Sequence, residues 1–564
     1  MLISPTKFPR KCRSFFALMF VLSWALLLLW IYITNQPTQA NSKQTFEGKE
    51  NVNEPPNSRK SYSAVIQEFS LSLYADTDPN RFHLNVNKSH MTSVTRDVQD
   101  TRPSQCAAVQ YEIASLPVAS IVIPLHNEPW STLERLINSI LKRSPPQLLK
   151  EIIIIDDMSD LDHLGDPLNR YAEQFDVLKI HRALERLGTM KARVLGTQLA
   201  KGDVVVFLDS HTEVNVGWLE PLLHEISKHN TAIVQPSIDV VDPDTFQYRQ
   251  YFKNNLRGHF KWSMGFEYVP LTVKQKAEVV AEPTKAFNTP AIVGCAFAVN
   301  RKYFQDIGGL DTGMRTWGGE DVELSVRVWL CGGSMKISPC SHVAHIHKSA
   351  HPFKMDYSDL VYNNRRTAEM WLGNYRKYFY YFNAGFAKPP GPSETFSEMD
   401  EIKKKFKCKD FDWLLKNVYT ELEIPPEGSE YFGHLRNLGS GFCFGPSDSS
   451  VVGSFPIITQ GDCFIYYKVR NFALLKNGLL MVDGKCVYIE QNFLVISPCS
   501  KGISKWSFKG KQLVYKDIFG SKCAVQVPKV VDSTEKQVAM MIPCDSSNRA
   551  AEWEITNKLY KVDI

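Results

Sequence analysis

Residues Asp203–His211 read DVVVFLDSH, a short apolar run that ends in a carboxylate, a hydroxyl and an imidazole. A continuous run of β-branched and other apolar residues, bounded by polar ones, predicts a strand that is buried on both faces. Similar runs occur at Ser120–Leu125 (SIVIPL), Glu151–Asp157 (EIIIIDD), Val177–His181 and Ala232–Val241. Apolar residues at helical spacing lie between them, at 133–141, 189–201 and 218–228. Strands alternating with helices predict an α/β domain with a mainly parallel sheet and helices on both faces.

Polar side chains stand where two of these strands end. Asp156 and Asp157 close the second strand, and Asp209 and His211 close the fourth. Ligands of such a sheet bind at the carboxyl ends of its strands. Residues two apart in an extended segment point to the same side, so Asp209 and His211 can converge on one cation. A carboxylate with imidazoles suits Mn²⁺ or a similar first-row ion. Taken alone, the triplet fits an ordinary strand-end turn as well.

Two further segments carry candidate ligands. Residues 343–351 read VAHIHKSAH and offer a third metal ligand and phosphate contacts, or else form a histidine-rich surface loop. Residues 308–323 read GGLDTGMRTWGGEDVE, directly before a helix predicted at 322–330. Glycines allow close approach of the backbone, a tryptophan offers a flat apolar face, and carboxylates accept hydrogen bonds from sugar hydroxyls. The alternative is a capped helix start after a flexible loop.

The N-terminal part predicts a membrane anchor. The chain has 564 residues, enough for two domains, and its net charge of +5 gives no reason to expect a nucleic-acid partner. Residues 14–34 are uncharged and apolar, and basic residues 7, 10, 11 and 13 precede them. This pattern predicts a type II protein with a cytosolic tail at 1–13, a signal anchor at 14–34 and a lumenal remainder. A cleaved signal peptide is the alternative. Residues 35–104 are polar and predict a stem.

Cysteine usage agrees with a lumenal location. Eleven cysteines follow the anchor, so at least one is unpaired or pairs between chains, and Cys295 is the one we choose. The triplet Asn87-Lys88-Ser89 predicts N-glycosylation of Asn87.

The C-terminal part differs in composition. A Pro- and Gly-rich run, AKPPGPSE at 387–394, opens a predicted linker at 389–430. Residues 431–564 have short apolar runs and three cysteine pairs at similar spacing, which predicts an all-β module with a threefold repeat. Each repeat would carry one bridge: Cys443–Cys463, Cys486–Cys499 and Cys523–Cys544.

The ordered motifs resemble the polypeptide N-acetylgalactosaminyltransferases. The motifs are IVIPLHNE, IIIIDD, VVVFLDSH, TPAIVG, GGLDTGMRTWGGEDVELSVRVWLCGG, PCSHVAHIHKSAHP and NNRRTAEMW. The resemblance implies a GT-A catalytic domain at 105–388, with a Rossmann-like sheet, and a ricin-type β-trefoil at 431–564. It also implies a Golgi membrane enzyme that uses Mn²⁺ and transfers N-acetylgalactosamine from UDP-GalNAc to Ser or Thr of polypeptides, with retention of configuration.

By the same resemblance, particular residues receive roles. The metal ligands are Asp209, His211 and His345, and Asp209 and Glu320 are assigned to catalysis. The implied contacts to UDP-GalNAc are Asp157, Arg186, Asp209, Ser210, Trp317, Lys348, His351 and Phe353. Two further disulfides, Cys106–Cys340 and Cys331–Cys408, are implied, which leaves Cys295 over.

Several positions depart from the family pattern. In the donor region these are Pro124, Cys295, Asp321, Lys348 and Phe353. In the trefoil, Gly445, Tyr488 and Val525 stand where sugar-binding repeats have Asp, so we expect a structural role for that domain. Trp506 and Trp553 are expected in its core. The departures leave two alternatives to an active enzyme: a non-catalytic binding protein, or a transferase with another UDP-sugar donor.

Overall fold

The computed structural model describes residues 79–251, 256–348, 350, 356–383, 386–390, 396–452, 455–461, 470–499, 505–517, 520–531, 534–545 and 547–557. The expected anchor at 14–34 lies outside these residues. Among the residues that are described, none of the helices is both long and apolar enough to cross a membrane.

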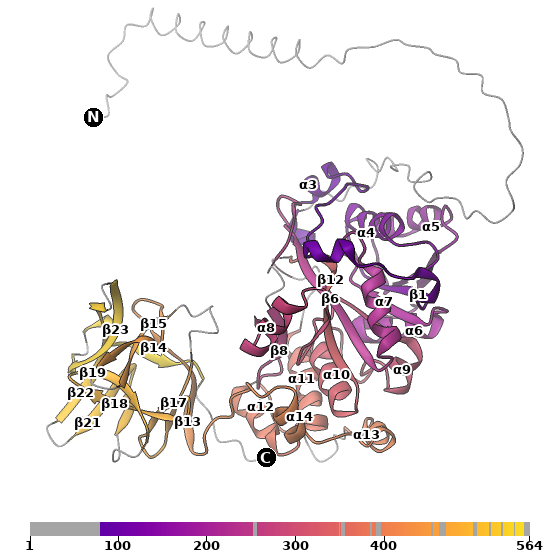
Figure 1. Cartoon of the computed structure of the whole chain (residues 1–564). Helices are drawn as coiled ribbons and strands as arrows, with labels where there is room; N and C mark the ends of the chain where they lie inside the picture. Colours follow the sequence, from indigo (N-terminus) through magenta and orange to yellow (C-terminus); the bar gives the residue numbers. More distant parts are fainter. Residues whose placement is uncertain are drawn as a thin grey trace, which may run out of the picture. The chain divides into compact units, whose positions relative to one another are not determined.

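The first domain is built on a mixed sheet of ten strands in the order β10-β12-β6-β11-β4-β1-β2-β3, with β5 and β7 at the side (Figure 1). One half is parallel as predicted: β1 pairs with β2 and β4, and β2 pairs with β3. The bounds of these strands are Ala119–Leu125 for β1, Leu149–Asp156 for β2, Leu178–Arg182 for β3 and Val204–Leu208 for β4.

The other half of the sheet departs from the parallel pattern. Strand β11 (Ala296–Asn300) lies antiparallel between β4 and β6 (Ala232–Val241), and β12 (Ser334–Ile346) runs parallel to β6. Three short strands pair antiparallel to these neighbours: β5 (Thr212–Val214), β7 (Tyr248–Arg249) and β10 (Phe287–Asn288). The apolar period of a buried strand carries no information about its direction, so the sequence does not reveal the reversal at β11.

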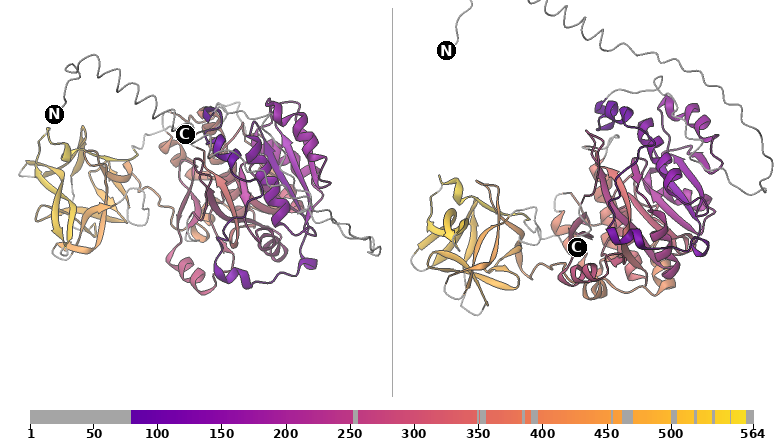
Figure 2. Two further views of the ribbon diagram at one scale, coloured as in Figure 1. Left: turned by 90° about the horizontal axis from the view of Figure 1, so that it is seen from above. Right: turned by 45° about the horizontal axis from the view of Figure 1, so that its top comes forward.

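Helices cover both faces of the sheet (Figures 1 and 2). Successive residues of a strand point to opposite faces, and β1 shows the result: Ile121 and Ile123 belong to one core cluster and Val122 to the other. On the first face lie α4 (Trp130–Arg143), α5 (Asp166–Ala172) and α7 (Leu219–Lys228). On the second lie α6 (Gly188–Leu199), α9 (Arg301–Asp306), α10 (Glu320–Leu330), α11 (Tyr357–Trp371) and α12 (Arg376–Phe382). A two-stranded sheet, β8 (Leu256–Phe260) with β9 (Phe266–Pro270), and α8 (Val273–Ala281) complete these elements.

The end of the expected stem is folded. Residues 79–104 contain α2 (Pro79–Phe82) and α3 (Val86–Met91), and Phe82, Leu84 and Val86 are buried in the first core cluster. These few apolar residues suffice to dock the segment, although the polar composition around them predicts no core. The stem therefore ends earlier than residue 104.

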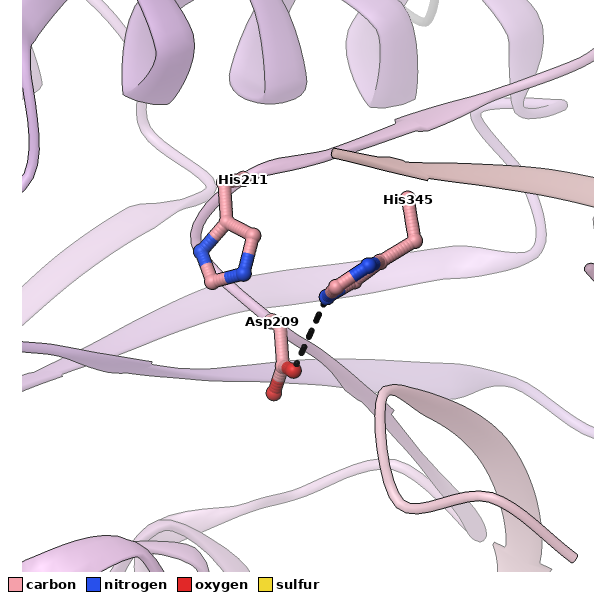
Figure 3. Close-up of side chains that lie close together, drawn as sticks. All are labelled: Asp209, His211 and His345. Atoms are coloured by element: carbon pink, nitrogen blue, oxygen red, sulfur yellow. Dashed lines mark ion pairs between the residues drawn. The ribbon is translucent and has the colours of Figure 1, made fainter. Parts of the chain in front are cut away.

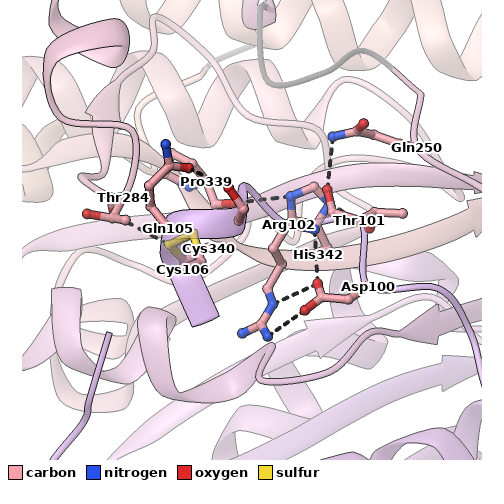
Figure 4. Close-up of a disulfide and its surroundings, with 11 residues drawn as sticks. Asp100, Thr101, Arg102, Gln105, Cys106, Gln250, Thr284, Pro339, Cys340 and His342 are labelled. Atoms are coloured by element: carbon pink, nitrogen blue, oxygen red, sulfur yellow. Dashed lines mark hydrogen bonds and ion pairs between the residues drawn. A yellow bond between two sulfur atoms is a disulfide. The ribbon is translucent and has the colours of Figure 1, made fainter. Parts of the chain in front are cut away.

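A disulfide ties this segment to the sheet (Figure 4). Cys106 and Cys340 are bonded, with their Cα atoms 5.4 Å apart. Beside them, buried His342 donates from Nδ1 to Asp239 at 2.9 Å, and the Thr101 hydroxyl donates to the same carboxylate at 2.5 Å. The bridge and these hydrogen bonds hold the chain that enters the domain against β12.

Three further predicted disulfides are present in the structure. Cys331–Cys408, Cys486–Cys499 and Cys523–Cys544 are bonded, as expected. Cys463 of the remaining predicted pair lies outside the described residues. Cys295 is free, as predicted, and it is buried.

Part of the expected linker is helical. Residues 400–417 form α13 (Asp400–Phe406) and α14 (Phe411–Asn417), and Asp410 caps α14 by accepting from the Trp413 amide at 2.9 Å. Phe411 and Leu414 are buried in the second core cluster of the first domain. This segment is therefore part of that core.

The C-terminal domain is a separate antiparallel sheet, as predicted. Its strands are β13 (Ser429–Asn437), β14 (Cys443–Val452), β15 (Phe455–Gly461), β16 (Asn471–Leu475), β17 (Leu480–Val482), β18 (Lys485–Glu490), β19 (Phe493–Ser497), β20 (Trp506–Lys509), β21 (Gln512–Asp517), β22 (Gly520–Val531), β23 (Thr534–Pro543) and β24 (Trp553–Ile555). The repeat is visible in its core. Buried Trp506 donates from Nε1 to the Val487 carbonyl at 3.0 Å, and Trp553 donates in the same way to Ala524 at 2.8 Å. Each accepting carbonyl belongs to the residue after a disulfide-bonded cysteine.

Candidate active site

Three strand ends bring a carboxylate and two imidazoles together (Figure 3). Asp209 follows β4, His211 precedes β5, and β12 pairs with β5 in a register that sets His345 opposite Thr212. One ligand atom of each of Asp209, His211 and His345 lies within 4.8 Å of the other two. His345 Nε2 is 3.6 Å from Asp209 Oδ2, and the two imidazole centroids are 4.7 Å apart. Of the histidines in residues 343–351, His345 is the one that the pairing of β12 with β5 places beside Asp209 and His211.

Burial and neighbouring charges shift the pKa values of His345 and Asp209. Burial lowers the pKa of His345, which keeps the imidazole neutral near pH 7. Burial would raise the pKa of Asp209, but the nearby His345 imidazole and the charge of Arg193 outweigh it and hold that pKa well below its usual range. His345 Nδ1 is buried and has no hydrogen-bond partner among the described residues. A carboxylate with two imidazoles fits a divalent first-row ion.

A buried carboxylate supports one side of the cluster. Glu128, in the loop between β1 and α4, accepts from His211 Nδ1 at 2.9 Å and from Lys348 Nζ at 2.6 and 2.8 Å. Burial would raise the pKa of Glu128, but the Lys348 ammonium and His211 outweigh it and lower the pKa to about 2. An ionised carboxylate can only accept, so His211 Nδ1 carries a proton in this hydrogen bond, which leaves Nε2 as the ring nitrogen that can bind a metal ion.

Arginine supports the other side. Arg193 on α6 donates to Asp209 Oδ1 at 2.7 Å and to the Gly294 carbonyl at 2.8 Å, and lies 3.4 Å from Glu320 Oε1. Asp209 is also held by its own amide, which donates to the Cys295 carbonyl at 2.9 Å. Glu320 and Asp321 begin α10, and burial raises the pKa of both carboxyl groups.

Asp157 is a second acidic residue of the site. Asp157, after β2, pairs with Arg186 and accepts from the backbone amides of Leu187 and Gly188 at 2.6 and 2.9 Å. Gly188 has a φ of +74°, and a Cβ there would lie 2.6 Å from the Thr316 carbonyl oxygen. Only glycine allows this close approach of α6 to the loop before α10.

One cavity of about 410 Å³ connects these groups. Its lining includes Pro124, His126, Glu128, Asp157, Arg186, Asp209, Ser210, His211, Trp317, His345 and Lys348. The Trp317 loop is held from α11, where Asn363 Nδ2 donates to the carbonyls of Arg315 and Gly318, each at 2.8 Å. The cavity thus combines a metal-ligand cluster, cationic side chains and a flat aromatic wall.

Comparisons with known proteins identify the family. The family description "Glycosyl transferase family 2" matches residues 120–308, and "N-terminal domain of galactosyltransferase" matches residues 277–352. Polypeptide N-acetylgalactosaminyltransferase 4 of Mus musculus is 40% identical over 364 residues, which are 64% of this chain and 61% of that protein. Polypeptide N-acetylgalactosaminyltransferase 3 of Mus musculus is 34% identical over 495 residues, 83% of this chain and 75% of that protein. The chain belongs to the polypeptide N-acetylgalactosaminyltransferase family.

A solved family structure agrees with the two-domain architecture. The crystal structure of GalNAc-T7 with UDP, GalNAc and Mn²⁺ has a TM-score of 0.60 and 29% identity to this chain, and covers 91% of this chain and 95% of that one. The chain accordingly has a GT-A catalytic domain and a β-trefoil. The chain spans about three fifths of the length of the mouse polypeptide N-acetylgalactosaminyltransferase 4 that it matches.

The residues that the family resemblance implied are mostly brought together. Asp157, Arg186, Asp209, Ser210, His211, Trp317, His345 and Lys348 all line the cavity. Glu320 is not among the lining residues; Arg193 connects it to Asp209, which does line the cavity. His351 and Phe353 lie outside the described residues, so their predicted contacts remain predictions.

Three residues of the site had no role in the sequence prediction: Glu128, Arg193 and Asn363. Glu128 had a usable signal, because it closely follows the end of β1 at the edge where ligands bind. Asn363 lies in the motif NNRRTAEMW, whose contribution to the Trp317 loop is visible only in three dimensions.

Proposed function

We propose that this chain transfers N-acetylgalactosamine from UDP-GalNAc to Ser or Thr hydroxyls of secretory-pathway polypeptides, dependent on Mn²⁺ and with retention of configuration. The observation that carries the proposal is the cluster of Asp209, His211 and His345 in a cavity that also contains Asp157 and Arg186. The family membership and the Mn²⁺, UDP and GalNAc of the GalNAc-T7 structure support it.

Different residues of the site would bind different parts of UDP-GalNAc. Asp209, His211 and His345 would hold Mn²⁺, which supplies positive charge beside the diphosphate. Asp157 and Arg186 would hold the nucleotide end, and Lys348 would add a cation at the phosphates.

Trp317 would face the diphosphate and sugar, and Glu320 would lie beside the donor sugar. Both residues flank the glycines before α10, where the backbone can approach a ligand closely.

The transfer proposed here is a front-face reaction. The acceptor hydroxyl oxygen bonds to the anomeric carbon from the side of the leaving group while the bond from that carbon to the UDP oxygen breaks. The electron pair stays on UDP, and the hydroxyl proton passes to the departing phosphate oxygen. Glu320 is held by Arg193, which favours binding of the sugar over nucleophilic attack. A trapped glycosyl-enzyme would refute this route.

The cellular setting follows from segments outside the catalytic domain. We propose a single-pass type II Golgi membrane protein, anchored by residues 14–34, with the catalytic part in the lumen. Asn87 is exposed on α3 and accessible for a glycan. Ser89 of the same triplet is buried, with its hydroxyl 2.7 Å from that of Ser131, so the proposed glycosylation has to precede folding of this segment.

A different UDP-sugar is a second candidate donor. Cys295 and Asp321 flank Gly294, where a Cβ would lie 3.5 Å from Glu320 and 3.8 Å from the Asp321 Cβ. Added bulk at Cys295 and a carboxyl at Asp321 therefore stand close to the proposed sugar position. A panel of UDP-sugars with one acceptor peptide would separate this candidate from the first.

The trefoil is proposed to be structural. The positions expected for sugar-gripping carboxylates hold Gly445, Tyr488 and Val525 instead, and Val525 is buried within β22. A carboxylate acceptor is absent at all three of these positions, so lectin activity is not expected.

The decisive test is turnover of UDP-GalNAc by the purified protein on a Ser/Thr peptide library with Mn²⁺, beside Asp209→Ala. Metal-dependent transfer that is lost in the variant would support the proposal. A folded protein that binds UDP without transferring sugar would favour the non-catalytic alternative.

A further inference from the structure

Glu128 is the residue of the cavity with the most unusual set of contacts. Its two carboxylate oxygens accept from His211, which lies 83 residues away in the chain, and from Lys348, which lies 220 residues away. The side chains of Glu128 and Lys348 are only 4% and 5% exposed. One buried carboxylate therefore connects a metal-ligand imidazole with the cation expected at the diphosphate.

The loop that carries Glu128 is itself held firmly. The Glu128 carbonyl accepts from His163 Nε2 at 2.8 Å, and the preceding Asn127 donates from its amide to the Ser159 hydroxyl at 3.0 Å. Asn127 Oδ1 accepts from the Asp160 amide at 2.9 Å. These bonds fix the backbone, so the carboxylate has a defined position against His211.

We propose that Glu128 is a positioning residue that fixes the tautomer and orientation of His211 for the metal ion and holds Lys348 at the diphosphate side of the cavity. The proposal rests on the proposed function, since it assumes that the cluster of Asp209, His211 and His345 binds Mn²⁺. Glu128 accepts a hydrogen bond from His211 Nδ1 and so directs Nε2 to the ion. Carboxylate partners of this kind raise the basicity of a ligating histidine.

A purely stabilising role explains the contacts less well. A buried ion pair gains little over a well-packed apolar pair, because removing both charges from water is costly. Glu134, six residues further along the chain and on α4, shows the structural alternative. It is a buried carboxylate that accepts from Trp130 Nε1 at 2.7 Å and is not part of the cavity lining. Both partners of Glu128, by contrast, line the cavity.

The experiment measures Mn²⁺ affinity directly, from the loss of the free-ion EPR signal on titration, with and without UDP. Glu128→Ala is expected to weaken Mn²⁺ binding by about 10- to 100-fold. Glu134→Gln, the matched control on α4, should bind Mn²⁺ as the unaltered protein does. Thermal unfolding of each variant checks that it folds, and Glu128→Gln serves as the variant with the least change in volume.

A double variant separates positioning from charge. If the defect came only from an unneutralised Lys348 cation repelling Mn²⁺, then Glu128→Ala/Lys348→Met would restore the affinity, and the positioning of His211 would be refuted. Persistence of the defect in the double variant supports the proposal.

Two other outcomes would overturn it in distinguishable ways. Lower thermal stability of the Glu128 variants with unchanged Mn²⁺ affinity would leave Glu128 a structural residue only. Absence of Mn²⁺ binding in the unaltered protein, with and without UDP, would overturn the proposed function together with this inference.

Discussion

Asp321→Asn tests the electrostatics of the proposed sugar pocket. Asp321 lies beside Glu320 at the start of α10, and its Oδ1 accepts from the Val322 amide at 2.8 Å. Burial, together with the adjacent Glu320 charge, raises the pKa of Asp321 from 3.8 to about 7. Asparagine has the same shape and keeps the acceptor for the Val322 amide, but it carries no titrating proton.

The sign and size of the effect follow from linkage. Between pH 4 and 7 the folded state holds a proton on Asp321 that the unfolded state has released, so stability falls as the pH rises through this window. At about 1.4 kcal/mol for each pH unit, the full loss is about 4 kcal/mol, an upper value because the carboxyl is partly exposed. The variant should therefore match the unaltered protein near pH 4 and exceed it above pH 7, by on the order of 5–10 °C in Tm.

The assay is thermal unfolding of both proteins at a series of pH values from 4 to 8. Asp97→Asn is the control, because Asp97 is exposed, its pKa is lowered by a hydrogen bond from Lys142, and its removal should give no such rise with pH. A Tm difference between Asp321→Asn and the unaltered protein that stays constant across the series would refute the assignment of a near-neutral pKa to Asp321.

Two further substitutions and one labelling experiment test the fold and the site. Gly188→Ala should lower the free energy of unfolding in urea by more than Gly332→Ala does. Both glycines have positive φ, but only at Gly188 would the added Cβ lie 2.6 Å from a carbonyl oxygen, that of Thr316. Equal losses would contradict this close approach. Trp553→Phe should cost about 1–3 kcal/mol in the same assay by leaving the buried Ala524 carbonyl without its donor, and an unchanged midpoint would count against that hydrogen bond. Cys295 should resist alkylation in the folded protein and react on unfolding, as followed by mass spectrometry, because burial raises its pKa well above the usual value; rapid labelling of the native protein would disprove its burial.

Strands and helices near the active site were predictable because their patterns are local. The run Glu151–Asp157 predicts a strand, and β2 covers Leu149–Asp156. The segment 411–417 also had a readable signal, an Asp cap followed by apolar residues at helical spacing, yet the adjacent Pro- and Gly-rich run favoured a linker. The direction of β11 was not predictable, since pairing partners rather than residue pattern decide it.

For the site, the sequence predicted groups whose partners are close in the chain and missed those that depend on the fold. The spacing of Asp209 and His211 made them candidates, and the further motifs decided between a metal site and an ordinary strand-end turn. His345 needed either the resemblance or the register between β5 and β12. The position of Glu128 after a strand marks it as a candidate, but its contact with His211, 83 residues away, and that of Arg193 with Gly294, 101 residues away, depend on the fold.

Two departures from the family pattern, Lys348 and Asp321, lie at opposite ends of one series of polar side chains in the site. Neighbouring polar side chains form a series, Lys348, Glu128, His211, Asp209, Arg193 and Glu320, of which the first four line the cavity. The metal ligands occupy the middle of this series and are complete. Lys348 stands at one end, beside the proposed diphosphate site, and Asp321 follows Glu320 at the other, beside the proposed sugar site. Lys348 and Asp321 thus stand where the donor would be held, so these two departures concern the affinity and identity of the donor first.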